Sequence, residues 1–385
     1  LLVRELHCDG GIVISASHNP PEYNGIKLFD AEGFKLPDAV EDEIEAFIKQ
    51  GGLEGQVERA REAGDEDAAM PSGPELGVAV EVDEACEMYI EHAVRSIREQ
   101  GIDFEGLTVA LDTGHGASSL TSPTALRRLG AEVIVINDDY NGNDINVECG
   151  STHLGPLCAR MRAGGYDLGI AFDGDADRCL FCDENGNVID GDDTLALLGT
   201  YMKKQGKLRG NVVATIMSNM GLASYLKPYG IEVTATKVGD RHVLEEMRRS
   251  GSNIGGEQSG HVILSDYATT GDGQLTALKF IEMLSSEDVK ASQLASGIFH
   301  FPQVIKGVRV SNAVKKQVAG HRLIAEMEKK ASEAFKGEGR INIRPSGTEA
   351  LVRVMAEGRD KALVERIAGE ACEAVEAAAK DLEGR

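Results

Sequence analysis

Short apolar runs alternate with amphipathic stretches along most of the 385 residues, and this alternation predicts a chain built mainly from α/β units. Each run is short enough for a strand and is bounded by residues typical of turns. The predicted strands lie at 11–15, 26–29, 107–111, 132–136, 167–172, 212–217 and 231–236. Helical spacing of apolar residues predicts helices elsewhere, such as one over 38–48 with Ile44, Phe47 and Ile48 on one face.

Changes in composition divide the chain into four predicted domains, at 1–72, 78–184, 185–299 and 300–385. A polar, Gly- and Pro-containing stretch over 51–77 is interpreted as a long loop or linker. The second and third domains repeat the order strand–turn–helix–Gly–strand, which predicts right-handed crossovers and parallel sheets. The first is too short for a typical domain and is interpreted as one that is incomplete at its N-terminus.

The predicted order of elements changes after residue 298: it becomes a strand, a helix over 314–335, two paired strands and a last helix from Asp360. This order predicts a small α+β domain. The predicted fold class is therefore α/β and multidomain, with three Rossmann-like α/β units, the first of them N-terminally incomplete, and a C-terminal α+β domain.

The chain is acidic, because 40 Lys and Arg residues face 63 Asp and Glu residues, for a formal net charge of −23. Such a charge repels phosphate backbones and anionic lipid, so we expect neither nucleic acid nor a membrane as a partner. No apolar run approaches the roughly 20 residues of a membrane span. The first residues also lack the basic-then-apolar pattern of a secretory signal, which favours a cytoplasmic protein.

Seven irregularly spaced cysteines form no disulfide framework and favour reduced thiols. Cys179 and Cys182 do form a C-x-x-C pair, but no second half-site for zinc accompanies it. A three-residue step along a strand also directs the two thiols to opposite faces, so packed thiols are favoured over a redox or zinc site.

Four polar loops follow predicted strands, where open α/β sheets bind ligands. In the first loop, Ser17 lies beside His18 and before Asn19-Pro20. Ser17 is either a nucleophile next to a base or an ordinary turn serine, and the residues alone leave both interpretations open.

The second loop carries Asp173, Asp175 and Asp177 at alternate positions, followed by Arg178. Three carboxylates so spaced can converge on a hard cation such as Mg²⁺ or Ca²⁺. A calcium loop of EF-hand type is disfavoured, because Arg178 stands at its sixth position, where that loop needs Gly. A solvated acidic turn is the remaining alternative.

The third and fourth loops suit a polar, anionic ligand. Gly255 to His261 combines glycines with Glu257, Ser259 and a histidine, which offer donors and acceptors to sugar hydroxyls. Arg344 to Thr348 combines an arginine, two hydroxyls and a glycine, which together form an anion cradle. Plain turns are the alternatives, and Lys237 to Arg241 is a weaker fifth candidate.

Taken together and in order, ASHNP (16–20), DGDADR (173–178), GEQSGH (256–261) and RPSGTE (344–349) resemble the α-D-phosphohexomutase family. The resemblance covers essentially the whole chain and implies four domains around a central cleft, each contributing one loop. Ala350 departs from the family pattern, where proline is common. The family's FGTDG-like N-terminal segment has no counterpart in this sequence.

The resemblance also implies a role for each matching residue. Ser17 is expected to carry the phosphoryl group and, with Asp173, Asp175 and Asp177, to hold one Mg²⁺. Sugar hydroxyls are expected at Glu257 and Ser259. Proton transfer or transition-state charge is expected at His18, Lys27, Arg178 and His261. The substrate phosphate that does not react is expected at Arg344, Ser346, Gly347, Thr348 and Arg353.

Within the family, the chain most resembles the branch that interconverts glucosamine 6-phosphate and glucosamine 1-phosphate, with a hexosamine 1,6-bisphosphate as intermediate and activator. The alternatives are an enzyme of the same mechanism that acts on mannose and glucose phosphates, and a non-catalytic phosphosugar-binding fragment. A dinucleotide-binding enzyme is disfavoured, because residues 112–116 contain G-x-G without the full fingerprint. A small phosphosugar is the expected partner, and a homodimer stays an open option.

Overall fold

The computed structural model describes residues 1–346 and 349–383. It divides into two compact units. The first comprises Leu1–Ile216 and Thr234–Ala295, and the second comprises Met217–Val233 and Ser296–Arg385. Among the described residues, no helix has both the length and the apolar character needed to cross a membrane.

The first unit opens with a two-stranded antiparallel hairpin. Its early elements are α1 (Leu2–Glu5), β1 (Gly10–Ser15), β2 (Gly25–Asp30), α2 (Asp38–Lys49), α3 (Gly52–Glu62) and η1 (Gly73–Glu75). The helix α3 corrects our interpretation of 51–77 as loop. Gly51 adopts a left-handed conformation that ends one helix and allows the next to begin, and the following Leu, Glu, Gln and Arg residues are good helix formers.

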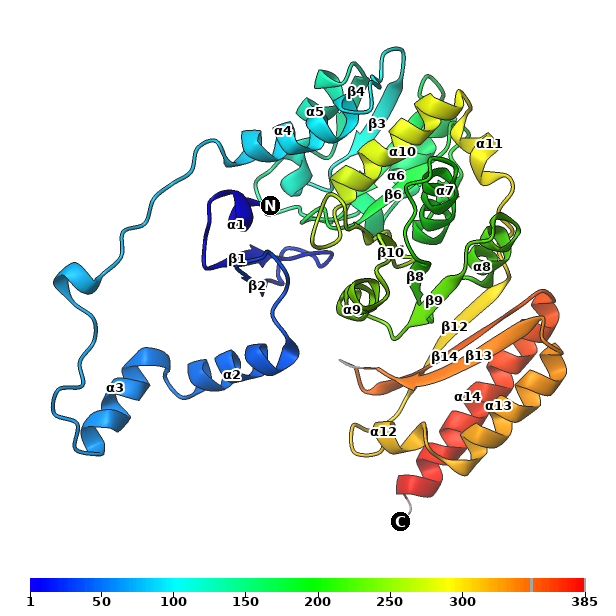
Figure 1. The fold of residues 1–385 in the computed structure, drawn as a ribbon. Helices are drawn as coiled ribbons and strands as arrows, with labels where there is room; N and C mark the ends of the chain where they lie inside the picture. Colours follow the sequence, from blue (N-terminus) through cyan, green and yellow to red (C-terminus); the bar gives the residue numbers. More distant parts are fainter. Residues whose placement is uncertain (347–348, 384–385) are drawn as a thin grey trace. The chain divides into compact units, whose positions relative to one another are not determined.

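A five-stranded sheet follows in the first unit, in the order β4-β3-β5-β6-β7. Its strands β3, β4 and β6 are labelled in Figure 1. Its strands are β3 (Thr108–Asp112), β4 (Glu132–Ile136), β5 (Leu168–Phe172), β6 (Cys179–Cys182) and β7 (Val188–Ile189). The accompanying helices are α4 (Ala85–Arg98), η2 (Ala117–Leu120), α5 (Ser122–Arg128), η3 (Gly150–Thr152) and α6 (Gly155–Arg162). β3, β4 and β5 are parallel, as predicted, but β6 and β7 are antiparallel, since a hairpin rather than a helix joins β5 to β6.

The other sheet of this unit has the order β11-β10-β8-β9. Its strands are β8 (Val212–Thr215), β9 (Val233–Thr236), β10 (Ile254–Gly256) and β11 (Val262–Leu264). The helices nearby in sequence are α7 (Gly191–Lys204), α9 (Asp240–Ser250), α10 (Gly273–Glu287) and α11 (Ala291–Ala295). α10 connects the two sheets, because Phe280 stacks on Phe181 of β6 at 4.2 Å between ring centroids.

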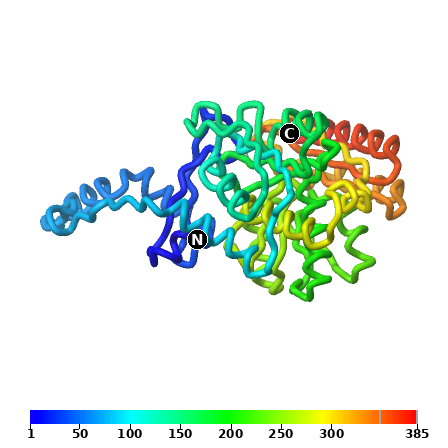
Figure 2. The backbone as a smooth tube through the Cα atoms, turned by 90° about the horizontal axis from the view of Figure 1, so that it is seen from above, coloured from blue at the N-terminus to red at the C-terminus, as the bar shows by residue number. Residues whose placement is uncertain are grey.

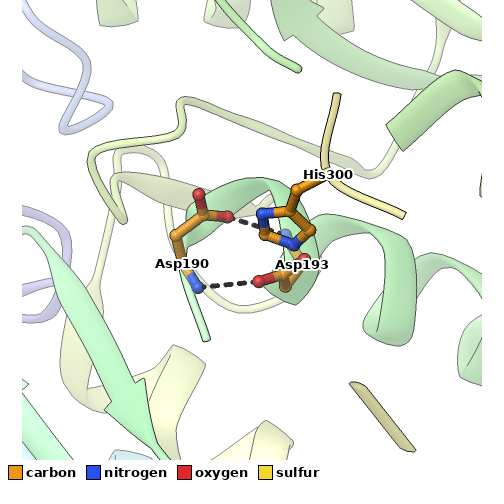
Figure 3. Close-up of side chains that lie close together, drawn as sticks. All are labelled: Asp190, Asp193 and His300. Atoms are coloured by element: carbon orange, nitrogen blue, oxygen red, sulfur yellow. Dashed lines mark hydrogen bonds between the residues drawn. The ribbon is translucent and has the colours of Figure 1, made fainter. Parts of the chain in front are cut away.

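The start of α7 is fixed by a reciprocal capping box, drawn in Figure 3. The Asp193 N–H donates to Asp190 Oδ1 (3.1 Å), and the Asp190 N–H donates to Asp193 Oδ2 (3.1 Å). Two backbone donors that the helix itself cannot satisfy are thereby paired. This end of α7 anchors the loop after β10, described below.

The second unit has a three-stranded antiparallel sheet in the order β12-β14-β13. Its elements are α8 (Met220–Leu226), η4 (Lys227–Tyr229), β12 (Gln303–Arg309), α12 (Lys315–Val318), α13 (Arg322–Phe335), β13 (Gly339–Pro345), β14 (Leu351–Gly358) and α14 (Lys361–Glu383). α13 and α14 lie side by side (Figure 2) and enclose the core against this sheet. The helix predicted over 314–335 is two helices, because His321 is extended and its side chain caps α13.

Candidate active site

Ser17 lies in the turn after β1, and its backbone is joined to the acidic loop. Its φ of 54° is unusual for a non-glycine residue and costs of order 1 kcal/mol or more. The Ser17 carbonyl accepts hydrogen bonds from Asn146 Nδ2 (2.7 Å) and from the Gly174 N–H (3.1 Å). The Ser17 hydroxyl lies 3.4 Å from His18 Nδ1. The strained backbone of Ser17 therefore holds its hydroxyl beside an imidazole and next to the start of the 173–178 loop.

The 173–178 loop connects β5 to β6 and brings its three carboxylates together. One oxygen each from Asp173, Asp175 and Asp177 lies within 4.8 Å of the others. The turn is made by Ala176 at a φ of 57°. Asp173 Oδ2, Asp175 Oδ1 and Asp177 Oδ1 are buried and accept no hydrogen bond within the described ranges. Buried carboxylate oxygens without donors are the ligands that a divalent cation requires, so these residues fit Mg²⁺.

Two cations contact this acidic trio (Asp173, Asp175 and Asp177). Lys27 on β2 donates to Asp175 Oδ2 (2.5 Å) and Asp177 Oδ2 (3.0 Å). Arg178 Nε lies 3.8 Å from Asp177 Oδ1 and 4.0 Å from Asp173 Oδ2. The cluster thus joins the hairpin β1–β2 to the five-stranded sheet.

Two opposing effects set the pKa values in this cluster: burial disfavours the charged form of each group, and neighbouring opposite charges favour it. Burial, followed by the charges of Asp177 and Asp175, raises the pKa of Asp173 well above its usual range. Burial would also raise the pKa of Asp177, but the nearby His261, together with the charge and hydrogen bond of Lys27, outweighs it and lowers that pKa. For Lys27, burial lowers the pKa, yet Asp177 and Asp175 outweigh it and raise it. At His18, burial and the charge of Arg178 lower the pKa of the imidazole.

His261 is buried, with 3% of its surface exposed, and it faces the same cluster. Its Nδ1 lies 3.5 Å from Asp177 Oδ1, and its Nε2 lies 3.8 Å from Asp240 Oδ2. A backbone bridge pairs His261 with Arg178. Gly271 packs against the ring so closely that an added Cβ would lie 2.3 Å from it. The histidine is therefore fixed in place beside the acidic trio.

Glu257 and Ser259 lie in the same short loop as His261, between β10 and β11. Glu257 Oε1 accepts a hydrogen bond from the Gly239 N–H (3.1 Å). The Ser259 hydroxyl is buried and lacks a hydrogen-bond partner in the described part of the chain. Gln258 instead points to α7, where its Nε2 donates to Asp190 Oδ2 (3.2 Å). The loop is thus anchored by Gln258, while Ser259 keeps unused hydrogen-bonding capacity.

The predicted anion cradle lies in the second unit, at the end of the β13–β14 pair. Arg344 and Arg353 stand directly opposite each other in the ladder, where like charges are unfavourable, and Arg353 Nη2 donates to Glu349 Oε2 (2.6 Å). Burial and the charge of Arg353 lower the pKa of Arg344. Ser346 is buried, and its Oγ accepts from the Glu349 N–H (3.2 Å). Gly347 and Thr348 lie outside the described residues.

Sequence reasoning gave no role to two residues that support the site. Asn146 holds the Ser17 loop, yet it lies in a run of turn residues over 141–146 that gave no signal of its own. Asp240, next to His261, pairs with Lys35. The only signal for Asp240 in the sequence is its position directly after a predicted strand, in the weaker fifth candidate loop over 237–241.

Models of the phosphoglucomutase/phosphomannomutase family match this chain in four segments. They are α/β/α domain I over 1–54, α/β/α domain II over 87–186, α/β/α domain III over 190–301 and the C-terminal domain over 306–374. The phosphoglucosamine mutase of Ruminiclostridium cellulolyticum is 47% identical over 376 residues, which are 97% of this chain and 80% of that protein. The phosphoglucosamine mutase of Acetivibrio thermocellus is 44% identical with the same coverage.

Solved structures agree on the fold. A phosphoglucomutase/phosphomannomutase family protein from Burkholderia thailandensis has a TM-score of 0.74 at 24% identity, over 96% of this chain and 76% of that one. The N-acetylphosphoglucosamine mutase of Aspergillus fumigatus, solved with GlcNAc-6P and magnesium, has a TM-score of 0.71 at 19% identity, over 96% and 89%. The fold class is therefore confirmed. The chain belongs to the phosphoglucomutase/phosphomannomutase, or α-D-phosphohexomutase, family.

Proposed function

We propose that this chain is an isomerase that interconverts glucosamine 6-phosphate and glucosamine 1-phosphate. Relatives named phosphoglucosamine mutase, 44–47% identical over nearly the whole chain, support this substrate. The observation that carries the proposed chemistry is the hydrogen bond from the Gly174 N–H to the Ser17 carbonyl (3.1 Å). It links the serine loop to the loop of three carboxylates. The proposed phosphoryl transfer needs these two loops next to each other.

Ser17 would act as the phosphoryl carrier. In the first transfer, the Oγ–P bond of phosphoserine breaks and a P–O bond forms to the free sugar hydroxyl, whose proton passes to a base. His18, with Nδ1 3.4 Å from Ser17 Oγ, would donate a proton to the departing serine oxygen in this step and take it back when Ser17 is phosphorylated again. The product is a 1,6-bisphosphate, which must turn over before its other phosphoryl group returns to Ser17. The same bisphosphate, bound from solution, would act as activator.

Asp173, Asp175 and Asp177, with the Ser17 phosphate, would hold one Mg²⁺. When bound, this ion would supply positive charge that offsets the negative charge of the transferring group. Arg178 and Lys27 would add positive charge beside that group, and His261 is expected to help in charge or proton transfer.

The remaining loops would hold the rest of the substrate. Glu257 would accept hydrogen bonds from ring hydroxyls, and Ser259 would donate or accept them, in both orientations of the bound sugar. Arg344, Ser346 and Arg353, with Gly347 and Thr348, would bind the phosphate that does not react. An anion site reads charge more than stereochemistry, which suits a substrate that binds in two orientations. We expect a cytoplasmic enzyme, and a homodimer stays an option.

A coupled assay on glucosamine 6-phosphate with a trace of 1,6-bisphosphate tests the activity. We expect turnover in wild type, at least a thousandfold loss in Ser17→Ala, and no loss in the control Ser224→Ala, an exposed serine on α8. Intact-protein mass spectrometry should find the phosphate on wild type and not on Ser17→Ala. Full activity in Ser17→Ala would contradict the scheme.

The family description also names glucose and mannose phosphates as substrates of relatives, so the sugar needs its own test. We expect kcat/KM for glucosamine 6-phosphate to exceed those for glucose 6-phosphate and mannose 6-phosphate at least tenfold. Equal values would favour the phosphomannomutase/phosphoglucomutase alternative. Binding of sugar phosphate without any turnover would favour a non-catalytic protein.

A further inference from the structure

We propose that Lys27 is a built-in counterion that occupies the acidic trio in the metal-free chain and leaves it when a divalent cation binds. The proposal rests on the metal site proposed above and adds a second state of Lys27. The ammonium group is then displaced from the carboxylates into the cavity beside them.

The contacts of Lys27 carry this inference. Its Nζ is 2.5 Å from Asp175 Oδ2 and 3.0 Å from Asp177 Oδ2, so one ammonium bridges two of the three carboxylates. The side chains are largely buried, with exposures of 27% for Lys27, 10% for Asp175 and 19% for Asp177. Three carboxylates within 4.8 Å of one another would repel strongly without such a cation.

Lys27 leaves several carboxylate oxygens of the acidic trio without a hydrogen bond. Asp173 Oδ2, Asp175 Oδ1 and Asp177 Oδ1 accept no hydrogen bond in the part of the chain that the structure describes. A single charge with three donors cannot satisfy all of them, whereas a divalent cation takes several oxygen ligands at once. The ammonium therefore neutralises the trio only in part and can be replaced.

The position of Lys27 on the chain couples this exchange to the serine. Lys27 lies in β2, paired with Val13 of β1, and the turn between the two strands carries Ser17. The lysine also lines a cavity of about 190 Å³, with Lys35, Tyr89 and Thr270 among its walls, which gives its side chain space to move. A displaced ammonium thus has room on the side of Lys35 and Tyr89, while its strand stays paired with β1.

Mn²⁺ binding, measured by electron paramagnetic resonance on protein of matched Ser17 phosphorylation, tests the exchange. In Lys27→Met the competing ammonium is absent, so we expect the dissociation constant for Mn²⁺ to fall about threefold, which corresponds to an ion-pair energy of ~0.7 kcal/mol. Lys27→Arg keeps a cation and should bind Mn²⁺ as wild type does. Lys35→Met removes another half-buried lysine of the same cavity, one paired with Asp240, and should leave the affinity unchanged.

Melting temperatures give a second readout that does not depend on activity. In EDTA, Lys27→Met should melt below wild type, and Mg²⁺ should raise its melting temperature by more than it raises that of wild type. Unchanged or weaker Mn²⁺ affinity in Lys27→Met, or an equal gain in Lys35→Met, would overturn the exchange while leaving the metal site intact. Failure of wild type to bind Mn²⁺ at all would overturn the proposed metal site itself, and the exchange with it.

Discussion

Ser259 keeps a buried hydroxyl without a hydrogen-bond partner among the described residues. A buried polar group in that state costs stability, and a sugar hydroxyl could satisfy it only when substrate is bound. The amide nitrogen of Asn146 illustrates the opposite case, because it donates to the carbonyl oxygens of Ser17 and Asn19, whereas its Oδ1 is buried without a partner among the described residues. Polar groups at this site are thus of two kinds: some form hydrogen bonds that stabilise the fold, and others lack a partner within the chain and are available to a ligand.

Ser259→Ala should separate binding from stability. Removing the unsatisfied hydroxyl should leave the melting temperature unchanged or slightly higher, while KM for the sugar phosphate rises about tenfold, as one lost hydrogen bond of ~1.4 kcal/mol predicts. Steady-state kinetics and thermal melts of the same preparations measure both. Ser224→Ala is the control. A large fall in melting temperature with unchanged KM would assign Ser259 to the fold instead.

The cysteines should differ sharply in reactivity. Cys8 and Cys86 are exposed, whereas burial raises the pKa of Cys149 to about 12. At pH 8 that thiol stays protonated and cannot attack, because the thiolate is the nucleophile. A colorimetric disulfide reagent should therefore titrate two thiols quickly in the native chain and all seven after denaturation. Fast reaction of Cys149 at pH 8 would contradict the burial.

At the scale of elements, the loops that bear the site depend on close backbone approach. An added Cβ on Gly174 would lie 2.5 Å from the Ser17 carbonyl oxygen, and one on Gly191 would lie 2.1 Å from the Glu257 carbonyl oxygen. The strand-following positions of these loops could be predicted from apolar runs. Their packing against one another could not, because Gly174 and Ser17 are 157 positions apart and no local pattern encodes the approach.

Gly174→Ala should therefore separate the serine loop from the acidic loop. The methyl group cannot be accommodated without moving backbone, so we expect at least a hundredfold loss of kcat, with a smaller change in substrate KM. Assay of the purified variant, after circular dichroism shows native helix content, provides the measurement. Near wild-type kcat would mean that the two loops need not touch.

Gly369→Ala is the matched glycine substitution where space is open. Gly369 lies inside α14, and nothing lies within 4 Å of an added Cβ. Alanine should stabilise the helix by about 0.8–1.0 kcal/mol, because glycine pays more backbone entropy on folding. A higher melting temperature with unchanged activity is expected, and destabilisation would show that α14 bends or packs differently.

For the whole molecule, the order of motifs carried more information than any single one. Four loops in family order predicted the fold class, and the structure bears that out, with the acidic trio, Lys27, Arg178 and His261 in one cluster. What could not be predicted was local helix formation in charged sequence, as in α3, and supporting residues such as Asp240. Helix propensity is a weaker signal than the glycines that led us to interpret 51–77 as a loop. The supporting role of Asp240 depends on tertiary contacts, which local sequence does not encode.

Net charge gives the last prediction, because −23 concentrated on one chain destabilises the folded state through self-repulsion. Raising NaCl from 10 mM to 150 mM shortens the screening length from about 30 Å to about 8 Å. We expect the melting temperature to rise by a few degrees, because a gain of about 1 kcal/mol shifts it by roughly 4–8 °C in units of 60–100 residues and by less in larger ones. Choline chloride at equal ionic strength should act alike, since screening does not depend on which cation is present. A lower melting temperature in salt would mean that ion pairs such as Lys27–Asp175 outweigh the repulsion of the excess acidic residues.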